Sequence, residues 1–143
     1  MTADAPLAEL LRSPLGRLDR RVLDDARAAG FADLVPAHLA VLHHPGPDGR
    51  RPSELADAAG MTKQALNYLL GQLEQLGYLT REVDRLGDDR RSKRVYLTER
   101  GEALRRTIRA SVTAIETELE AALGARDHRQ LRRLLARLDS LRA

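Results

Sequence analysis

The most regular apolar pattern in the chain lies near its middle. Five leucines recur there at the three- and four-residue spacing of one helix face: Leu66, Leu69, Leu70, Leu73 and Leu76. Thr62 precedes this stripe and can accept a hydrogen bond from a free backbone N–H, so it is expected to cap the helix. Upstream, Pro52 suits the first turn of a shorter helix, and Gly60 is placed to end it. This pattern predicts two short helices joined by a tight turn, a helix-turn-helix.

Two short segments that follow these helices have the composition of β-strands. Residues 78–83 and 93–98 are rich in Tyr, Leu, Val and Thr, and they flank a turn that contains Gly and Asp. In the second segment Val95 and Leu97 alternate with residues such as Tyr96, which predicts a strand with one covered face. Residues 89–94 are basic, with four cations against Asp89 alone: Arg90, Arg91, Lys93 and Arg94. A basic hairpin directly after a helix-turn-helix predicts a winged helix.

The segment before this unit is expected to be helical as well. A helix is predicted from about residue 14 to residue 29, beginning at the pair Ser13–Pro14, and a shorter one from about 33 to 43. A loop rich in Pro and Gly follows at 45–49. Residues 1–13 are expected to be loosely held, although their leucines can pack as one helical turn or join a partner subunit.

Two further helices are expected after the hairpin. Thr98 can cap a long helix over residues 99–123, and residues 127–142 predict a final helix with a coiled-coil-like leucine seam. These stripes can pack on the core of their own chain, but the compact central unit leaves the terminal helices few surfaces to cover. Exposed stripes of this length favour aggregation of a monomer, so we expect a homodimer. The predicted fold is mainly α with a small β-hairpin wing, a winged helix-turn-helix flanked by N- and C-terminal helices.

Composition narrows the classes of function. The chain has 143 residues, of which 43% are hydrophobic and 31% charged, as in a single globular domain. The formal net charge is only +3, so the net charge alone does not indicate a nucleic-acid partner. The local concentration of positive charge in the hairpin is the more informative feature. The sequence contains no cysteine, which excludes disulfides, thiolate catalysis and cysteine-ligated metals. No apolar run approaches a membrane span and no signal-peptide pattern begins the chain, so we expect a cytoplasmic protein without membrane contact.

No catalytic site is predicted. The sequence has no Gly-rich phosphate-binding loop and no motif that unites a histidine, a carboxylate and a nucleophile. Its four histidines are poorly spaced to share a helix face, which argues against a metal site: His38, His43, His44 and His128. We therefore expect neither an enzyme nor a cofactor.

Five short segments, in this order and spacing, are similar to a known family: SELA at 53–56, Thr62 to Leu73, LEQLGYLTR at 73–81, DRRS at 89–92 and LTERG at 97–101. Through them the chain resembles the MarR family of winged helix-turn-helix transcriptional regulators over nearly its whole length. The resemblance implies one domain over residues 1–143. Its DNA-binding lobe would span about residues 33–98, and its dimerisation helices would span about residues 7–30 and 99–142. It also implies a homodimer that reads a pseudo-palindromic operator in double-stranded DNA, usually as a repressor, although activation stays open. A small-molecule effector of unknown identity would bind between the lobe and the dimerisation helices, a region near Phe31 and His38.

The polar side of the longer central helix carries candidate DNA contacts. Lys63 can donate to guanine O6 or N7, and Gln64 and Asn67 can pair with adenine N6 and N7 in the major groove. Tyr68 can touch a thymine methyl group or a phosphate. Thr62 lies where a phosphate would approach the helix N-terminus, but its capping role explains it equally well. A merely solvated polar face is the alternative, which the surrounding winged-helix pattern disfavours.

The basic hairpin carries the second set of candidates. Arg90, Arg91 or Arg94 can lie in or beside the minor groove, where the negative potential attracts guanidinium groups. The resemblance implies that Asp89 holds one of these arginines toward DNA by a salt bridge. A charged hairpin tip that only prevents edge-strand association is the alternative. A winged-helix module that binds an acidic protein partner, without specific DNA binding, would use the same surfaces.

Overall fold

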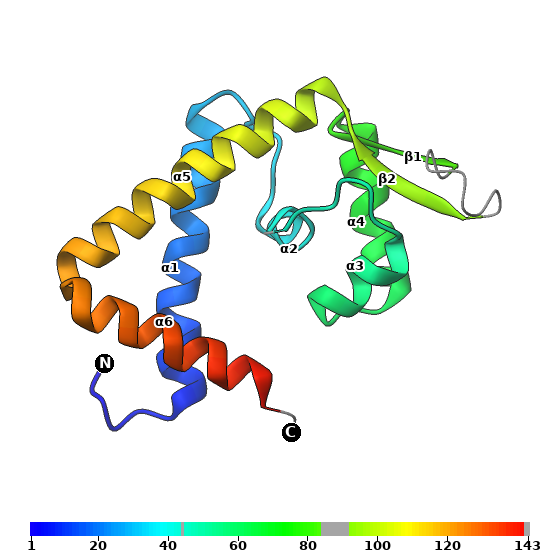
Figure 1. The fold of residues 1–143 in the computed structure, drawn as a ribbon. Coiled ribbons are helices and arrows are strands. Elements are labelled where there is room, and N and C mark those ends of the chain that lie inside the picture. Colours follow the sequence, from blue (N-terminus) through cyan, green and yellow to red (C-terminus); the bar gives the residue numbers. More distant parts are fainter. Residues whose placement is uncertain (44, 84–91, 142–143) are drawn as a thin grey trace.

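The computed structural model describes residues 1–43, 45–83 and 92–141 of the chain (Figure 1). Its elements in chain order are α1 (Leu7–Ala28), the 3-10 turn η1 (Pro36–His38), α2 (Leu39–Leu42), α3 (Pro52–Ala59), α4 (Lys63–Gln75), β1 (Leu79–Val83), β2 (Lys93–Leu97), α5 (Glu99–Leu123) and α6 (Ala125–Ser140). The strands form one antiparallel sheet in which Leu79 lies opposite Leu97. The mainly α fold with a small hairpin that the sequence predicts is confirmed.

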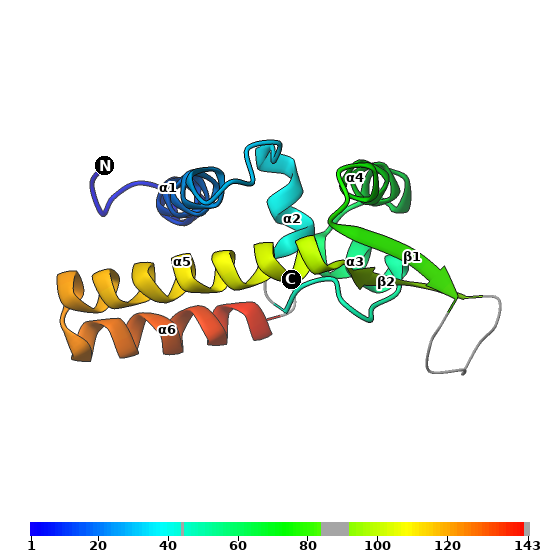
Figure 2. The ribbon, with the colours of Figure 1, turned by 90° about the horizontal axis from the view of Figure 1, so that it is seen from above.

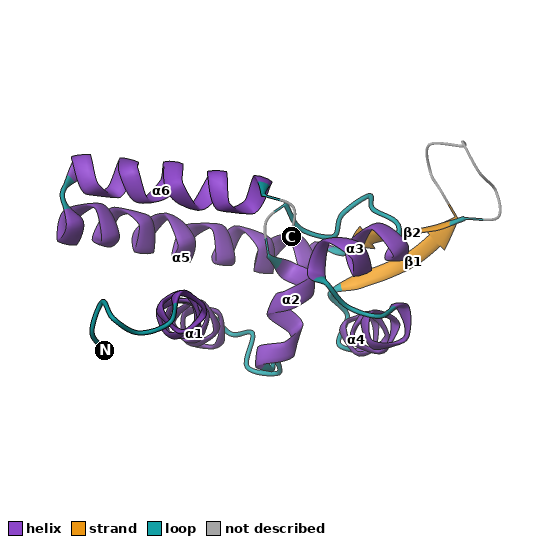
Figure 3. Ribbon diagram, turned by 90° about the horizontal axis from the view of Figure 1, so that it is seen from below, coloured by secondary structure: helices purple, strands orange, loops and turns teal. Residues whose placement is uncertain are grey.

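The elements gather at two ends of the molecule. α1, α5 and α6 form a helical lobe, in which α5 lies between α1 and α6 (Figure 2). α3, α4 and the two strands form a winged lobe at the other end, and α2 lies between the two lobes (Figure 3). One hydrophobic core joins them, since it includes Val22 of α1, Leu70 of α4 and Leu104 of α5. None of the helices in the described part of the chain has the length and apolar character that crossing a bilayer requires.

The helix-turn-helix forms as its end signals predict. α3 begins at Pro52, and Gly60 adopts the left-handed conformation (φ 64°) that ends it. The Thr62 hydroxyl accepts a hydrogen bond from the backbone N–H of Ala65 at 3.1 Å and so caps α4. Four leucines of the predicted stripe lie in the core: Leu66, Leu69, Leu70 and Leu73. The opposite side of α4 is therefore turned to solvent.

Two predicted helix starts are wrong. α1 begins at Leu7 rather than at Pro14, which lies inside the helix. The preceding stretch LAELLR consists of strong helix formers. The helix continues through Pro14 although the proline removes one backbone hydrogen bond and its ring crowds the carbonyl of the preceding turn. That stretch is therefore helical and not loosely held. The helix predicted over 33–43 begins only at Pro36. A proline disfavours helical conformations at the residue before it, and Val35 is accordingly extended (φ −116°, ψ 159°).

The C-terminal helices agree more closely with prediction. α5 spans the predicted residues, and the Thr98 hydroxyl caps it by accepting a hydrogen bond from the Gly101 backbone N–H at 3.1 Å. Gly124, at φ 85°, separates the two helices. α6 begins at Ala125, slightly before the predicted residue 127.

β2 is more enclosed than its alternating pattern predicts. Val95 and Tyr96 point to opposite sides of the strand, yet both are buried, since α3 and α5 both pack against β2. The expectation of one covered face is therefore wrong at this point. The outer edge of β2 is paired as well: the Val95 N–H donates to the Arg50 carbonyl at 2.9 Å, and the Gly49 N–H donates to the Val95 carbonyl at 2.7 Å. The end of the Pro- and Gly-rich loop thus serves as a third strand-like segment.

Tyr78 joins three distant parts of the chain. Its ring is fully buried, and its hydroxyl donates to Oδ1 of Asp33, in the loop after α1. The Arg100 guanidinium lies 4.2 Å above the centre of the same ring and donates to Oδ2 of Asp33 at 3.0 Å. Desolvation raises the pKa of Asp33, but the hydrogen bonds from Tyr78 and Arg100 together outweigh it and lower that pKa. The charged form of Asp33 therefore stabilises the fold.

We expect Tyr78→Phe to lower the free energy of unfolding by roughly 1–2 kcal/mol at neutral pH, because Asp33 loses a hydrogen-bond donor. The folded-state pKa of Asp33 lies below its ordinary value of 3.8, so this contribution is present above that pH and is lost as the pH falls below it. Urea unfolding of both proteins at about pH 7 and about pH 3 should show a smaller difference at the lower pH. The exposed Tyr68→Phe is the control, expected within about 0.5 kcal/mol of wild type. An equal difference at both pH values would contradict this role of Asp33.

Candidate nucleic-acid interface

The solvent-facing side of α4 brings the five candidates of the predicted recognition helix together. All of them are exposed: Thr62, Lys63, Gln64, Asn67 and Tyr68. The leucine stripe holds α4 to the core, so the first turns of the helix present hydrogen-bond donors and acceptors outward. Tyr68 exposes 67% of its surface, and its ring is thus available to a partner. The structure places these side chains on one surface, while their contact with DNA stays a prediction.

The structure describes only one of the four residues predicted to act in the wing. Arg94 of β2 is half-buried, and its Nη1 donates to the Gly49 carbonyl at 2.8 Å. This contact ties the hairpin to the loop before α3. Asp89, Arg90 and Arg91 lie outside the described residues. The predicted roles of all four at the minor groove therefore stay predictions.

A chain of hydrogen bonds runs from the interior to Tyr68. The backbone N–H of Val35 donates to Nδ1 of His38 at 3.1 Å. Nε2 of His38 lies 3.0 Å from Oε1 of Gln72, and Nε2 of Gln72 donates to the Tyr68 hydroxyl at 3.1 Å. His38 is only 2% exposed, so the chain links a buried histidine to the outer face of α4.

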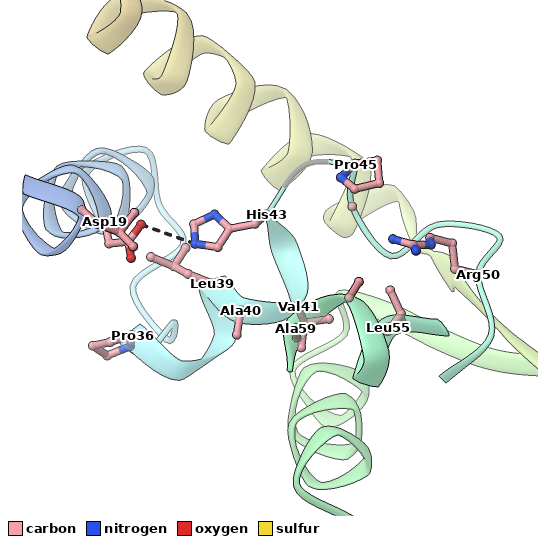
Figure 4. Close-up of a pocket in the computed structure, with 13 residues that line it drawn as sticks. Asp19, Pro36, Leu39, Ala40, Val41, His43, Pro45, Arg50, Leu55 and Ala59 are labelled. Carbon is pink, nitrogen blue, oxygen red and sulfur yellow. Dashed lines mark ion pairs between the residues drawn. The ribbon is translucent and has the colours of Figure 1, made fainter. Parts of the chain in front are cut away.

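A cavity of about 380 Å³ opens between α1, α2 and α3 (Figure 4). Apolar side chains make up much of its lining, among them Leu39 and Leu55. At one end Nε2 of His43 lies 3.4 Å from Oδ1 of Asp19, and Arg50 stands on the opposite side. The cavity therefore combines an apolar wall with a few polar groups, which is the usual composition of a small-molecule site.

The residues expected near an effector have other contacts in the structure. Phe31 packs against Tyr78, with ring centres 6.0 Å apart. His38 is bonded to Val35 and Gln72, as described above. Neither Phe31 nor His38 is among the described residues that line the cavity.

Known proteins identify the family. A family model described as the MarR family matches residues 33–92. The MarR family protein Rv2887 of Mycobacterium tuberculosis, solved in complex with salicylic acid, is 31% identical to this chain. The match covers 96% of this chain and 99% of that one, with a TM-score of 0.65. The chain belongs to the MarR family.

This MarR family member resembles further solved proteins. The transcriptional repressor CouR, bound to a 23-mer DNA duplex, is 25% identical over 94% of this chain and 92% of its own, with a TM-score of 0.71. MarR, known from a crystal structure, is 27% identical in sequence to this chain. The match covers 97% of this chain and 92% of MarR, with a TM-score of 0.75. The family and these relatives are transcription regulators. This chain is accordingly a MarR family transcription regulator with a DNA-binding winged helix.

Gln72 was not predicted to belong to this surface. His38 was considered for a metal site, which its spacing disfavours, and as a residue near an effector, but not as a residue of this surface. The spacing of Tyr68 and Gln72, four residues apart on one helix, is a signal that the sequence contains. The contact between Gln72 and His38 joins residues 34 positions apart, and no local pattern announces it.

Proposed function

We propose that this MarR family regulator is a homodimer that binds a pseudo-palindromic operator and represses transcription. In this proposal α4 enters the major groove of each half-site, and the hairpin lies beside the minor groove. One observation carries the proposal: the exposed polar side of α4 lies opposite a buried leucine stripe that packs the helix against the core. Two-fold symmetry then sets the half-sites about one helical turn, roughly 34 Å, apart.

The exposed side chains of α4 supply the chemistry of base reading. Lys63 donates to guanine, whereas Gln64 and Asn67 pair with adenine. The hydroxyl of Thr62 is engaged with the Ala65 N–H, so a phosphate at this end would be held by the free backbone N–H groups of α4. In the wing, we propose that at least one of three arginines lies in or beside the minor groove: Arg90, Arg91 or Arg94. A salt bridge from Asp89 would hold one of these arginines toward the DNA.

The helical lobe carries the apolar surface that a second copy would cover. None of the 16 residues of α6, all of them described, is buried. Exposed leucines nevertheless lie along it and at its end: Leu131, Leu134, Leu135, Leu138 and Leu141. α1 adds three more: Leu7, Leu11 and Leu15. Because so many exposed apolar side chains are a liability in a monomer, their exposure in the single chain supports the proposal of a homodimer.

The cavity between α1, α2 and α3 is the proposed effector site. The 31% identical Rv2887 was solved with salicylic acid, which supports a small-molecule effector for this chain. A volume of about 380 Å³ falls within the range of ligand sites, roughly 300–1,000 Å³. Arg50 offers donors to an anionic group there, on the side of the cavity opposite Asp19. Since the cavity touches both α1 and α3, a ligand would change how the two lobes are set relative to each other.

Fluorescence anisotropy tests the proposal, with the intergenic duplex beside the protein's own gene as probe and random duplex as competitor. We expect dimers to bind specifically, with an affinity that falls steeply as salt rises, because phosphate contacts release counterions. Binding without preference on every fragment would contradict specific operator recognition. No binding even at low salt would favour the winged-helix protein-interaction module instead.

Replacing Lys63 or Asn67 by Ala is expected to weaken operator binding by roughly 1–3 kcal/mol and to relax the sequence preference at the base each contacts. Binding to random duplex should change much less for Asn67→Ala, because an amide contributes little to phosphate attraction. Gln75→Ala, exposed at the far end of α4, is the matched control. If both variants bind the operator like wild type, the assignment of α4 as the recognition helix is wrong.

A further inference from the structure

We propose that His38 and Gln72 are positioning residues that set the direction of the Tyr68 hydroxyl, so that Tyr68 acts as a hydrogen-bond donor to DNA. This inference rests on the proposed use of α4 in DNA binding. It adds the direction of one hydrogen bond, namely that Tyr68 donates to DNA and does not accept from it. It also names two residues behind the DNA-facing surface that control this direction.

The polarity begins at a backbone amide. The N–H of Val35 can only donate, so Nδ1 of His38 must accept, at 3.1 Å. The proton of the neutral imidazole therefore resides on Nε2. This nitrogen lies 3.0 Å from Oε1 of Gln72 and donates to it. One backbone group thus sets the tautomer of the histidine.

Gln72 carries the donor-to-acceptor order of these hydrogen bonds to the surface of α4. With its oxygen engaged by His38, its NH2 group is turned toward Tyr68 and donates to the hydroxyl oxygen at 3.1 Å. The Tyr68 oxygen accepts this hydrogen bond, so its own hydrogen is left to point away from α4. The chain thus presents a directed donor on a side chain that is 67% exposed.

A donor in this place matches the chemistry of DNA. Phosphate oxygens only accept hydrogen bonds, and guanine and thymine offer further acceptors in the major groove. An exposed tyrosine ring would otherwise sample several orientations and lose that freedom on binding. The hydrogen bond from Gln72 restricts it beforehand, which reduces the entropic penalty of association.

Gln72→Glu reverses the last step of the chain. A carboxylate accepts from His38 as the amide oxygen does, but it cannot donate to Tyr68. The Tyr68 hydroxyl must then donate inward, and its hydrogen is no longer available to DNA. Gln75→Glu is the matched control, because it adds the same charge to an exposed glutamine of the same helix. Both substitutions are made in wild type and in Tyr68→Phe, and the dissociation constants are measured on operator and random duplex.

We expect Tyr68→Phe to weaken binding about tenfold, as for the loss of one hydrogen bond to a charged or strongly polar group. Gln72→Glu should weaken wild type roughly tenfold more than it weakens Tyr68→Phe, whereas Gln75→Glu should act equally in both. If Tyr68→Phe lowers the affinity for both duplexes, the acceptor of the Tyr68 hydrogen bond is a phosphate. If it lowers the affinity for the operator alone, the acceptor is a base edge. Equal effects of Gln72→Glu in both backgrounds, or an unchanged Tyr68→Phe, would overturn the inference. A wild-type protein that binds no duplex would instead overturn the proposed function itself.

Nitrogen-15 NMR of the free protein checks the origin of the polarity without DNA. We expect the His38 ring to show a protonated Nε2 and an unprotonated Nδ1. The opposite tautomer would overturn the inference, because Nε2 would then accept and Gln72 would turn its oxygen toward Tyr68.

Discussion

Glutamate in place of both Leu134 and Leu138 is expected to convert the protein into monomers and to abolish operator binding. These side chains keep 44% and 38% of their surface exposed, on a helix that packs against α5. In the proposed dimer the substitutions place four carboxylates in an apolar interface. Each unpaired charge costs several kcal/mol there, so the total is on the order of 10 kcal/mol. A monomer holds one half-site only, and the affinity gained from the second half-site is lost.

Sedimentation equilibrium and anisotropy on the operator measure both effects. Arg133→Glu is the control, because successive helix positions turn by about 100° and residue 133 lies away from the leucine side of α6. The double variant should keep its helical circular dichroism, which separates loss of the dimer from loss of the fold. A dimer that survives both glutamates would show that α6 lies outside the interface.

Gly101→Ala is expected to lower the free energy of unfolding by about 3 kcal/mol, the upper end for overpacking a filled site. A Cβ at this position would lie 1.9 Å from the Tyr78 carbonyl oxygen and 3.1 Å from Cδ2 of Leu97. The carbonyl is backbone, and it also accepts the hydrogen bond from the Thr98 N–H at 3.1 Å, so it cannot move aside freely. The first turn of α5 must then shift away from the strands. Because the same turn joins the wing to the helical lobe, operator affinity should fall with stability.

Urea unfolding at neutral pH measures the loss. Gly71→Ala is the matched control in α4, since its Cβ would meet only the end of Arg81 at 3.9 Å. Alanine is the better helix former, so this variant should gain up to about 1 kcal/mol. A Gly101→Ala protein as stable as wild type would mean that α5 accommodates the methyl group by a small rearrangement.

Local signals were sufficient for the central unit. The proline and glycine at the ends of α3 and the threonine that caps α4 act through contacts within one helical turn, and each could be identified by spacing. The same holds for Thr98 and α5. Pro14 misled the prediction of α1, because a proline marks a helix start only when the residues before it are poor helix formers. Pro36 acted in the opposite direction and shortened a predicted helix.

The candidate surface was predictable to the same extent. The exposure of Lys63, Gln64, Asn67 and Tyr68 follows directly from the leucine periodicity on the other side of α4. The position of Arg94 did not follow from periodicity, because its contact with Gly49 depends on a loop that returns to the edge of β2. The burial of Tyr96 likewise depends on elements that reach β2 from two directions.

The sequence by itself determined the mainly α fold with its hairpin, the helix that faces outward and the caps that limit it. These features arise from interactions between residues at most four positions apart, and the spacing of apolar and capping residues in the sequence shows them directly. The tertiary structure alone decided the contact of His38 with Gln72, that of Tyr78 with Asp33 and that of Arg100 with Asp33, over separations of 34, 45 and 67 residues. It also decided why position 101 must be glycine and where a cavity opens. Such features depend on how separate elements pack, and neither helix periodicity nor capping contains that information.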